Sequence, residues 1–291
     1  MNKLKLRPKN DLVFKVLMQK DKNVLKSFLM AILKIPEQSY KNIEIVNPFS
    51  LIEKMDDKVT ILDIKLELVN EVINVELQLN NTPYMEKRIL YGISKSITNQ
   101  KSKGNTYDFK KVISILITDY ILIKEHNKYH DIFKCMSAQT GYIFTDAIEI
   151  HTLELPKLPQ KLEDNHLHIW LQFLKSETEE ELEMLTEKIP EIDTAISFLR
   201  ELSQDEKIRM MAEARDAWIG DQLAREQEAM KRGREEGREE GREEGREEGI
   251  EEGAYRKSIE TANELFLLGL PIEQIEQVTK LDRATLENIQ K

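Results

Sequence analysis

Two acidic residues on neighbouring strand-like segments are the strongest candidates for chemistry in this chain. In residues 60–68, alternation places Asp63 on the polar face, opposite a run of leucine and isoleucine side chains. In residues 72–79, the polar face carries Glu76 and Gln78. Because only three residues separate the two segments, we expect a hairpin that brings Asp63 beside Glu76.

Two carboxylates beside a backbone carbonyl form an oxygen-rich pocket of the kind that binds Mg²⁺ or Mn²⁺. Such an ion polarises a phosphodiester oxygen and lowers the pKa of a bound water, which provides the nucleophile for hydrolysis. Alternation alone leaves a second interpretation open, because the solvated face of any amphipathic hairpin carries such charges. On that interpretation Asp63 and Glu76 are ordinary surface residues.

The surrounding segments indicate an α/β arrangement. Helical spacing is found over residues 11–34, which end before Pro36, and over residues 84–102. Strand-like runs cover residues 42–47, 58–68, 72–79, 111–123, 130–137 and 142–155. The run 111–123 is almost continuously apolar, which is typical of a strand buried on both faces. We therefore predict a mixed sheet flanked by helices.

The sequence changes character after the segment 156–159, and nearly everything beyond it favours helix. Interruptions are expected at Pro190, at Gly220, in a glycine repeat and at residues 269–271. We predict a catalytic domain over residues 1–160, followed by an all-helical C-terminal extension. Its parts are a helical extension over 161–230, a Gly-Arg-Glu-Glu repeat helix or linker over 231–253, and a small helical module over 254–291.

The glycine repeat places six glycines, from Gly233 to Gly253, at a period of four residues. On a helix this period gives one slowly drifting stripe. Each interior glycine costs about 1 kcal/mol relative to alanine, so an isolated helix of this sequence is expected to be weak. Two interpretations stay open: a close-approach stripe through which copies of the chain form a homo-oligomer, or a solvated tether.

Charge is distributed unevenly along the chain, whose formal net charge is −10. Residues 1–155 carry 23 Lys and Arg against 19 Asp and Glu, whereas residues 156–291 carry 20 against 34. The first 50 residues hold 10 basic residues against 4 acidic ones. The N-terminal half therefore permits a nucleic-acid partner, which the acidic second half would repel.

Several classes of protein are excluded by simpler features. A single cysteine, Cys135, provides neither a disulfide framework nor a cysteine-based zinc site. The N-terminus lacks the apolar core of a signal peptide, and no apolar run approaches the ~20 residues that span a bilayer. We expect a protein of the reducing cytoplasm that does not contact a membrane.

Five stretches of the chain share one family pattern. They are Asn10–Lys15, Leu62–Ile64, Asn74–Gln78, Arg88–Tyr91, and the glycine repeat ahead of the helical tail Leu267–Ile275. Together they resemble the PD-(D/E)XK nuclease superfamily, and specifically its transposase-like, recombination-promoting nuclease branch. The resemblance covers almost the whole chain and implies a restriction-endonuclease-like core.

This resemblance implies that Asp63 and Glu76 bind a metal ion and act in catalysis with Gln78. Gln78 stands where the superfamily usually has Lys. A lysine could stabilise transition-state charge, whereas the neutral amide of Gln78 can only form hydrogen bonds. Asp11, at the start of the first helix, would be a further metal ligand; alternatively, it is an acid favoured by the helix dipole.

The same resemblance implies that Arg88, Tyr91 and Lys15 contact DNA. For Arg88 and Tyr91 the alternative is a helix-surface residue and a packed aromatic ring. The expected function is a Mg²⁺-dependent DNA endonuclease, with Mn²⁺ as a substitute, that promotes DNA recombination or mobile-element defence. The alternative function is a non-catalytic DNA-binding or scaffolding protein that keeps the nuclease fold.

Overall fold

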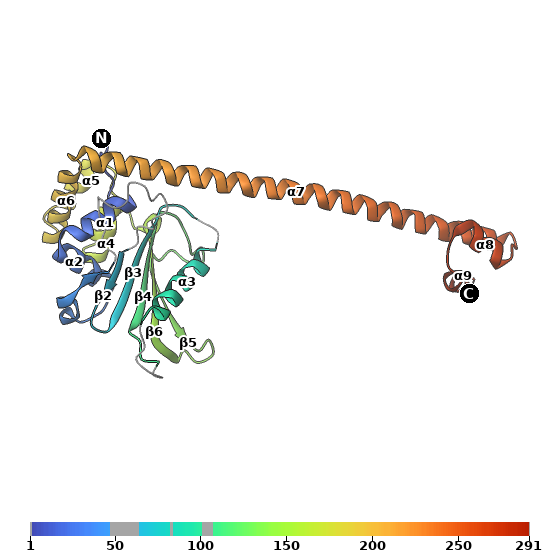
Figure 1. Cartoon of the computed structure of the whole chain (residues 1–291), viewed down its shortest axis with the longest axis horizontal. Coiled ribbons are helices and arrows are strands. Elements are labelled where there is room, and N and C mark those ends of the chain that lie inside the picture. Colours follow the sequence, from blue (N-terminus) through green and yellow to red (C-terminus); the bar gives the residue numbers. More distant parts are fainter. Residues whose placement is uncertain (1, 47–63, 82–83, 101–106, 291) are drawn as a thin grey trace. The chain divides into compact units, whose positions relative to one another are not determined.

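The computed structural model describes residues 2–46, 64–81, 84–100 and 107–290 (Figure 1). The chain forms two compact units, Met1–Ala217 and Trp218–Lys291. Within the described ranges, no helix is both long enough and apolar enough to cross a membrane.

The first unit is built around a mixed sheet, whose described strands are ordered β1-β2-β3-β4-β6-β5. Their bounds are β1 Glu44–Ile45, β2 Ile64–Glu67, β3 Glu71–Gln78, β4 Lys111–Thr118, β5 His130–Met136 and β6 Ile143–Glu154. β3, β4 and β6 run parallel, while β1, β2 and β5 are antiparallel to their neighbours. β4 is buried along nearly its whole length, as its continuous apolar run predicts.

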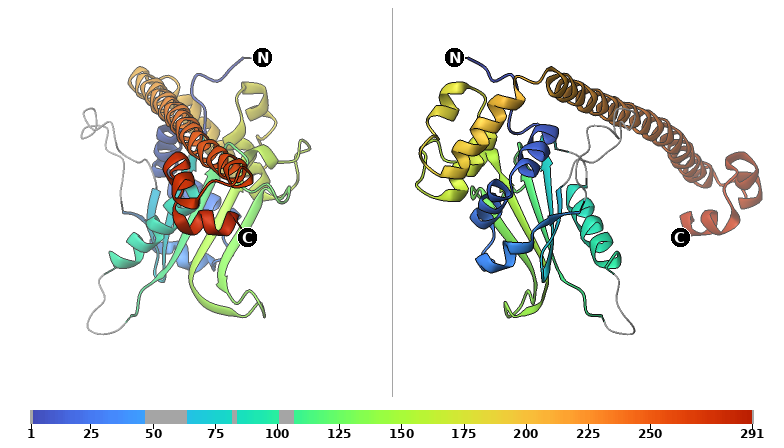
Figure 2. Two further views of the ribbon diagram at one scale, coloured as in Figure 1. Left: turned by 90° about the vertical axis from the view of Figure 1, so that its right-hand side faces the viewer. Right: turned by 60° about the vertical axis from the view of Figure 1, so that its left-hand side comes forward.

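Helices cover both faces of this sheet. The helices are α1 Asp11–Lys20, α2 Lys22–Ile32, α3 Met85–Thr98, α4 His166–Lys175, α5 Glu179–Glu183, α6 Pro190–Leu202, α7 Glu206–Leu267, α8 Ile272–Thr279 and α9 Arg283–Ile289, with short 3₁₀ helices at Glu37–Asn42 and Leu155–Lys157. Figure 2 shows α3 on one face of the sheet and α1, α2, α4 and α6 on the other. The prediction of a mixed sheet flanked by helices is therefore confirmed.

One expected helix, over residues 11–34, is two helices in the structure. The break is at Asp21, whose backbone is extended with φ −142° and ψ 125°. Its side chain accepts hydrogen bonds from the backbone N–H groups of Asn23 and Val24. Helical periodicity continues across the break, so the pattern predicts one helix. The Asp21 side chain instead caps the start of α2, and its extended backbone ends α1.

The core of the first unit extends well past residue 160, where we expected the catalytic domain to end. Trp170 on α4 packs edge-to-face against Phe28 on α2, with ring centroids 5.7 Å apart. Leu199 on α6 belongs to the same buried cluster. Helices α4 to α6 and the first turns of α7 are therefore part of the unit that contains the sheet.

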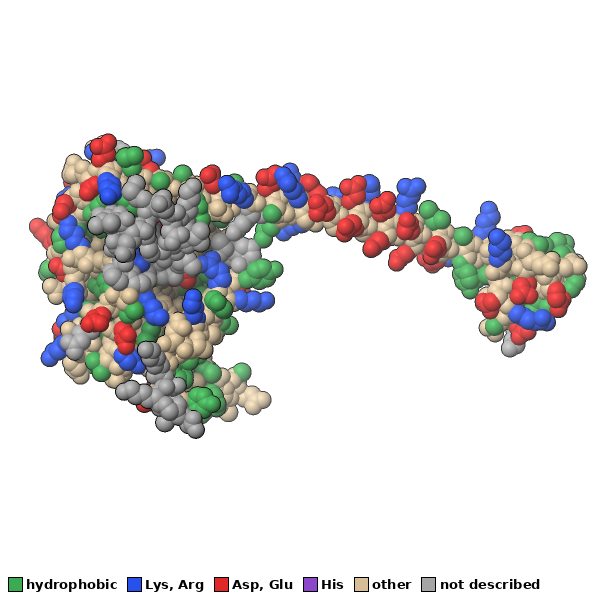
Figure 3. Space-filling model, viewed as in Figure 1, with side chains coloured by type: hydrophobic (Ala, Val, Ile, Leu, Met, Phe, Trp, Pro, Cys, Tyr) green, Lys and Arg blue, Asp and Glu red, His purple; other side chains and the backbone are tan. Residues whose placement is uncertain are grey.

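The second unit has little core of its own. Its described buried apolar residues are Ala262, Ile275, Leu281 and Leu286, where the end of α7 meets α8 and α9. Gly220 and the repeat glycines, expected as interruptions, lie inside α7. Ion pairs one turn apart support the helix there, such as Arg256–Glu252 at 2.9 Å, and basic and acidic side chains follow one another along it (Figure 3).

Candidate active site

Glu76 and Gln78 lie on the face of the sheet that α3 covers. They share this face with Val72, which is buried in a small cluster with Met85 and Ile89 of α3. In the parallel ladder with β4, Glu76 is paired with Leu116 and Gln78 with Thr118. Both polar residues therefore lie at the carboxyl end of a parallel strand, where α/β proteins commonly place their ligand sites.

The carboxylate of Glu76 is held by two donors. Gln78 Nε2 donates a hydrogen bond to Glu76 Oε1 at 2.5 Å, and Arg88 Nη2 donates to the same oxygen at 3.1 Å. The Glu76 side chain is 18% exposed and that of Arg88 43%. Both of these hydrogen bonds go to Oε1, and among the described residues none is seen to donate to Oε2.

Tyr120 belongs to the same site, although the sequence analysis did not single it out. It follows β4, where Thr118 Oγ1 donates a hydrogen bond to the Tyr120 carbonyl at 2.8 Å. Its buried hydroxyl has no hydrogen-bond partner among the described residues. Burial, and next the negative charge of Glu76, raise the pKa of Tyr120 to about 12. The phenol is therefore a protonated hydrogen-bond donor at the end of β4, within the electrostatic influence of Glu76.

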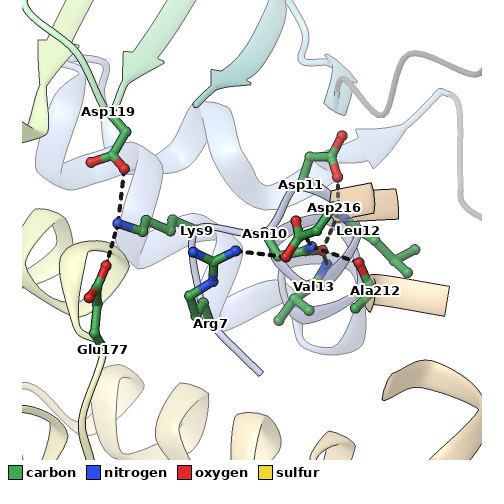
Figure 4. A network of polar contacts seen from close by, with 10 residues as sticks. All are labelled: Arg7, Lys9, Asn10, Asp11, Leu12, Val13, Asp119, Glu177, Ala212 and Asp216. Atoms are coloured by element: carbon green, nitrogen blue, oxygen red, sulfur yellow. Dashed lines mark hydrogen bonds and ion pairs between the residues drawn. The ribbon is translucent and has the colours of Figure 1, made fainter. Parts of the chain in front are cut away.

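A network of ion pairs fixes the end of β4 (Figure 4). Lys9 Nζ lies 2.9 Å from Asp119 and 2.8 Å from Glu177. Burial alone would lower the pKa of Lys9, but the hydrogen bonds to Glu177 and Asp119 outweigh it and raise the pKa. The backbone N–H of Asp119 donates to the Gln78 carbonyl at 3.0 Å. The N-terminal segment thus anchors the strand end beside Gln78.

Asp11 stands at the start of α1, where Asn10 caps the helix. Its Oδ2 accepts from Arg215 Nε at 2.9 Å and lies 2.8 Å from Arg215 Nη2. Oδ1 accepts from the backbone N–H of Leu12. The structure brings Asp11 to Arg215, in the first turns of α7, and shows no contact between Asp11 and Glu76.

The three residues expected to contact DNA differ in exposure. Tyr91 is 71% exposed on α3, and Arg88 on the same helix reaches the Glu76 carboxylate. Lys15 is only 2% exposed, inside the first unit. Arg88 and Tyr91 are therefore accessible from solvent, whereas Lys15 is enclosed.

Of the metal ligands expected from the sequence, the structure describes Glu76 and Asp11. Asp63 lies outside the described residues. Within the described part of the chain, no three His, Cys, Asp or Glu side chains form a group that could hold a metal ion. Of the two carboxylates expected at the candidate site, Asp63 and Glu76, the structure therefore describes Glu76.

Comparison with known proteins identifies a family. A family profile described as PD-(D/E)XK nuclease family transposase matches residues 8–229. This range covers the sheet, its flanking helices and the start of the glycine-repeat helix. No curated protein and no solved structure shows significant similarity to the chain. The matched range is most of the chain, so the protein belongs to the PD-(D/E)XK nuclease family transposases.

Proposed function

We propose that this protein is a metal-dependent DNA endonuclease that hydrolyses phosphodiester bonds in DNA recombination or mobile-element defence. The observation that carries the proposal is the position of Glu76. Its partly exposed carboxylate lies beside Gln78 at the carboxyl end of β3, in a chain whose family is one of nucleases. The exposed Cys135, without a disulfide partner, is consistent with work in a reducing cytoplasm.

The residues at this position suit a hard divalent cation. Glu76 offers Oε2, to which no described residue donates a hydrogen bond, and carboxylate oxygens are the ligands that Mg²⁺ and Mn²⁺ prefer. Asp63 directly precedes Ile64, whose partner across the ladder is Val75, the residue directly before Glu76. We therefore assign the second carboxylate to Asp63. When bound, the ion supplies Lewis-acid polarisation of the phosphodiester.

The other residues of the site have separate roles. Gln78, hydrogen-bonded to Glu76, orients that carboxylate and offers an amide to the attacked phosphate. Tyr120 provides a neutral hydroxyl donor. Arg88 provides the positive charge that the residue at position 78 lacks. Asp11 is assigned to holding Arg215, because breaking an enclosed ion pair to free a metal ligand is costly.

Nicking of a supercoiled plasmid in Mg²⁺ or Mn²⁺ tests the proposal. We expect Glu76→Ala and Asp63→Ala to lose activity while circular dichroism stays unchanged, because the partly exposed Glu76 side chain is outside the buried apolar core and Asp63 is assigned to the same polar face. The matched control is Glu67→Ala, which removes a carboxylate 51% exposed at the other end of β2. If Glu76→Ala nicks DNA as fast as the parent protein, the metal-site assignment is wrong.

Gln78 allows a finer test of the same site. Removing a hydrogen bond to a charged group costs about 1.5–3 kcal/mol, so Gln78→Ala should lower the rate by roughly one to two powers of ten. Gln78→Lys restores the commoner residue of the superfamily and should keep or raise the maximal rate. A lysine beside the ion should also raise the Mg²⁺ concentration for half-saturation. A Gln78→Ala protein that cleaves normally at every Mg²⁺ level would make Gln78 a surface amide.

A second candidate function is a non-catalytic DNA-binding or scaffolding protein. The observation that favours it is the Arg88–Glu76 ion pair, because Arg88 already places a positive charge on the carboxylate that a metal ion would need. Titration calorimetry with Mn²⁺ separates the two functions. An endonuclease should release or absorb heat that Glu76→Ala removes, and a scaffold should give no such heat.

A further inference from the structure

The outward face of α3 combines aromatic and basic side chains. Met85, Ile89 and Ile93 mark the buried side of α3. Viewed down the helix axis, the residues on the opposite, outward side occupy a sector of about 100°. The residues that define this surface, called the α3 stripe below, are Tyr84, Lys87, Tyr91 and Lys95. Ser94 and Thr98 complete the sector, so it contains no acidic side chain.

Both tyrosines of the α3 stripe hold large rings in solvent. Tyr84 is 70% exposed and Tyr91 71%. Tyr84 also has a left-handed backbone, with φ 63°, which is unusual for a bulky residue and costs on the order of 1 kcal/mol. Burial of the ring does not offset this cost, because the ring is exposed. Strain that packing does not explain is typical of residues kept for binding.

The lysines give the α3 stripe a positive charge beside each ring. Lys87 Nζ lies 5.1 Å from the centroid of the Tyr84 ring. Lys95 is one turn beyond Tyr91 on the same side of the helix. The acidic residue of α3, Glu86, falls on the flank of the helix. Flat rings interleaved with cations match the bases and phosphates of a nucleic-acid strand.

The α3 stripe is continuous with the candidate active site. Arg88 follows Lys87 in the helix and donates its hydrogen bond to Glu76 at 3.1 Å. Figure 3 shows basic and apolar side chains gathered over the region of α3. A strand bound along the α3 stripe therefore passes Arg88 and comes within reach of the Glu76 carboxylate.

We propose that the α3 stripe binds single-stranded DNA, with unpaired bases stacked on Tyr84 and Tyr91 and phosphates paired with Lys87 and Lys95. In a duplex the faces of the bases are stacked on one another, so the two rings could engage them only after unpairing. The α3 stripe thereby selects unpaired or locally opened DNA. Delivery of that strand for cleavage rests on the endonuclease function proposed above.

Fluorescence anisotropy of a labelled oligothymidylate, measured on the full chain with a chelator present, tests this surface. Stacking on one tyrosine contributes about 1–3 kcal/mol, so Tyr91→Ala should weaken binding about 5- to 150-fold. Tyr91→Phe keeps the ring and should bind like the parent. The matched control is Tyr142→Ala, which removes a tyrosine also 70% exposed, before β6, and should leave binding unchanged. Lys95→Ala should reduce the salt slope by about 0.7.

The outcomes separate this proposal from the endonuclease function. The α3 stripe proposal is overturned if Tyr91→Ala binds like the parent, or if a duplex of equal length binds more tightly than the single strand. Tighter binding of oligouridylate than of oligothymidylate would overturn DNA as the ligand. If the parent binds single strands through Tyr91 but never nicks DNA in Mg²⁺ or Mn²⁺, the α3 stripe stands and the endonuclease function fails.

Discussion

The two compact units use helices in opposite ways. In Met1–Ala217 the helices bury apolar side chains against a sheet, and Phe28, Trp170 and Leu199 are almost fully enclosed. In Trp218–Lys291 most of α7 is exposed, and Leu267 is 88% exposed. The first kind of helix is stabilised by tertiary packing, the second by pairs of side chains one turn apart. Segments of similar helix-favouring composition are therefore stabilised in two different ways.

Residues 161–217 belong to the unit whose helices are stabilised by tertiary packing. From composition this segment resembles the acidic tail, yet α4 and α6 complete the core over α1 and α2. Stability and chemistry should consequently respond to changes in these helices and be largely indifferent to changes in the repeat.

Truncation should produce the largest difference between the units. A chain ending at residue 160 loses α4 to α6 and uncovers the apolar face of α2, so we expect aggregation or loss of the fold. A chain ending at Ala217 keeps the whole first unit and should remain folded. Circular dichroism and sedimentation of the two proteins measure this. A folded, monodisperse 1–160 protein would show that the helices beyond it are dispensable.

A matched pair of leucines should produce the next largest difference. Leu171 on α4 is fully buried, and replacing such a leucine with alanine costs about 2–5 kcal/mol. Leu267, at the end of α7, is exposed, so Leu267→Ala should change the free energy of unfolding by less than about 0.5 kcal/mol. Urea denaturation followed by tryptophan fluorescence reports both units, through Trp170 in the first and Trp218 at the start of the second. Equal effects of the two substitutions would remove the energetic contrast between the units.

Acid should weaken the first unit through a pair of histidines. His130 Nε2 lies 2.9 Å from His151 Nδ1, and His151 Nε2 lies 2.8 Å from Glu149 Oε1. Burial, and next the charge of His151, lower the pKa of His130 to about 4. An unfolded histidine titrates near 6.5, so between these pH values the unfolded chain binds more protons. The contribution of neutral His130 to stability should therefore be fully present above about pH 6.5. It should be lost progressively as the pH drops towards 4.

The size of this effect is limited because the His130 ring is partly exposed. We expect the free energy of unfolding to fall by no more than about 2 kcal/mol between pH 7.5 and 5. Melting temperatures measured across this range should show the loss. His130→Gln should flatten the profile. All five histidines lie in the first unit, so protonation of His130 should destabilise that unit and not the glycine repeat. An unchanged profile in His130→Gln would assign the acid response to other groups.

Alanine substitutions in the glycine repeat should produce the smallest change in stability. Unlike the changes above, they should increase it. A Cβ added at Gly237, Gly241 or Gly245 meets no atom within 4 Å, so each substitution should stabilise the helix by about 1 kcal/mol. Thermal loss of the helical circular dichroism signal measures this. A fall in oligomer mass on sedimentation, with the helix intact, would instead support the close-approach stripe between copies.

Features that depend on local pattern could be predicted from the amino-acid sequence. Alternation placed Glu76 and Gln78 on one face of a strand, and the apolar run of β4 predicted burial on both sides. The order of segments was sufficient for a mixed sheet flanked by helices. The prediction that Asp63 binds metal stays a prediction, because Asp63 lies outside the described residues.

Contacts between residues far apart in the sequence could be seen only in the folded protein. Periodicity shows that a helix has an apolar face but not what that face packs against, so it could not place α4 and α6 in the first unit. Tyr120 lies 44 residues from Glu76 in sequence, and only the pairing of β3 with β4 brings both residues to the same end of the sheet. The ion pair of Asp11 with Arg215, 204 residues further along the chain, also depends on the fold, while metal binding by Asp11 stays a prediction. Contacts of this kind depend on the path of the whole chain, which no local pattern encodes.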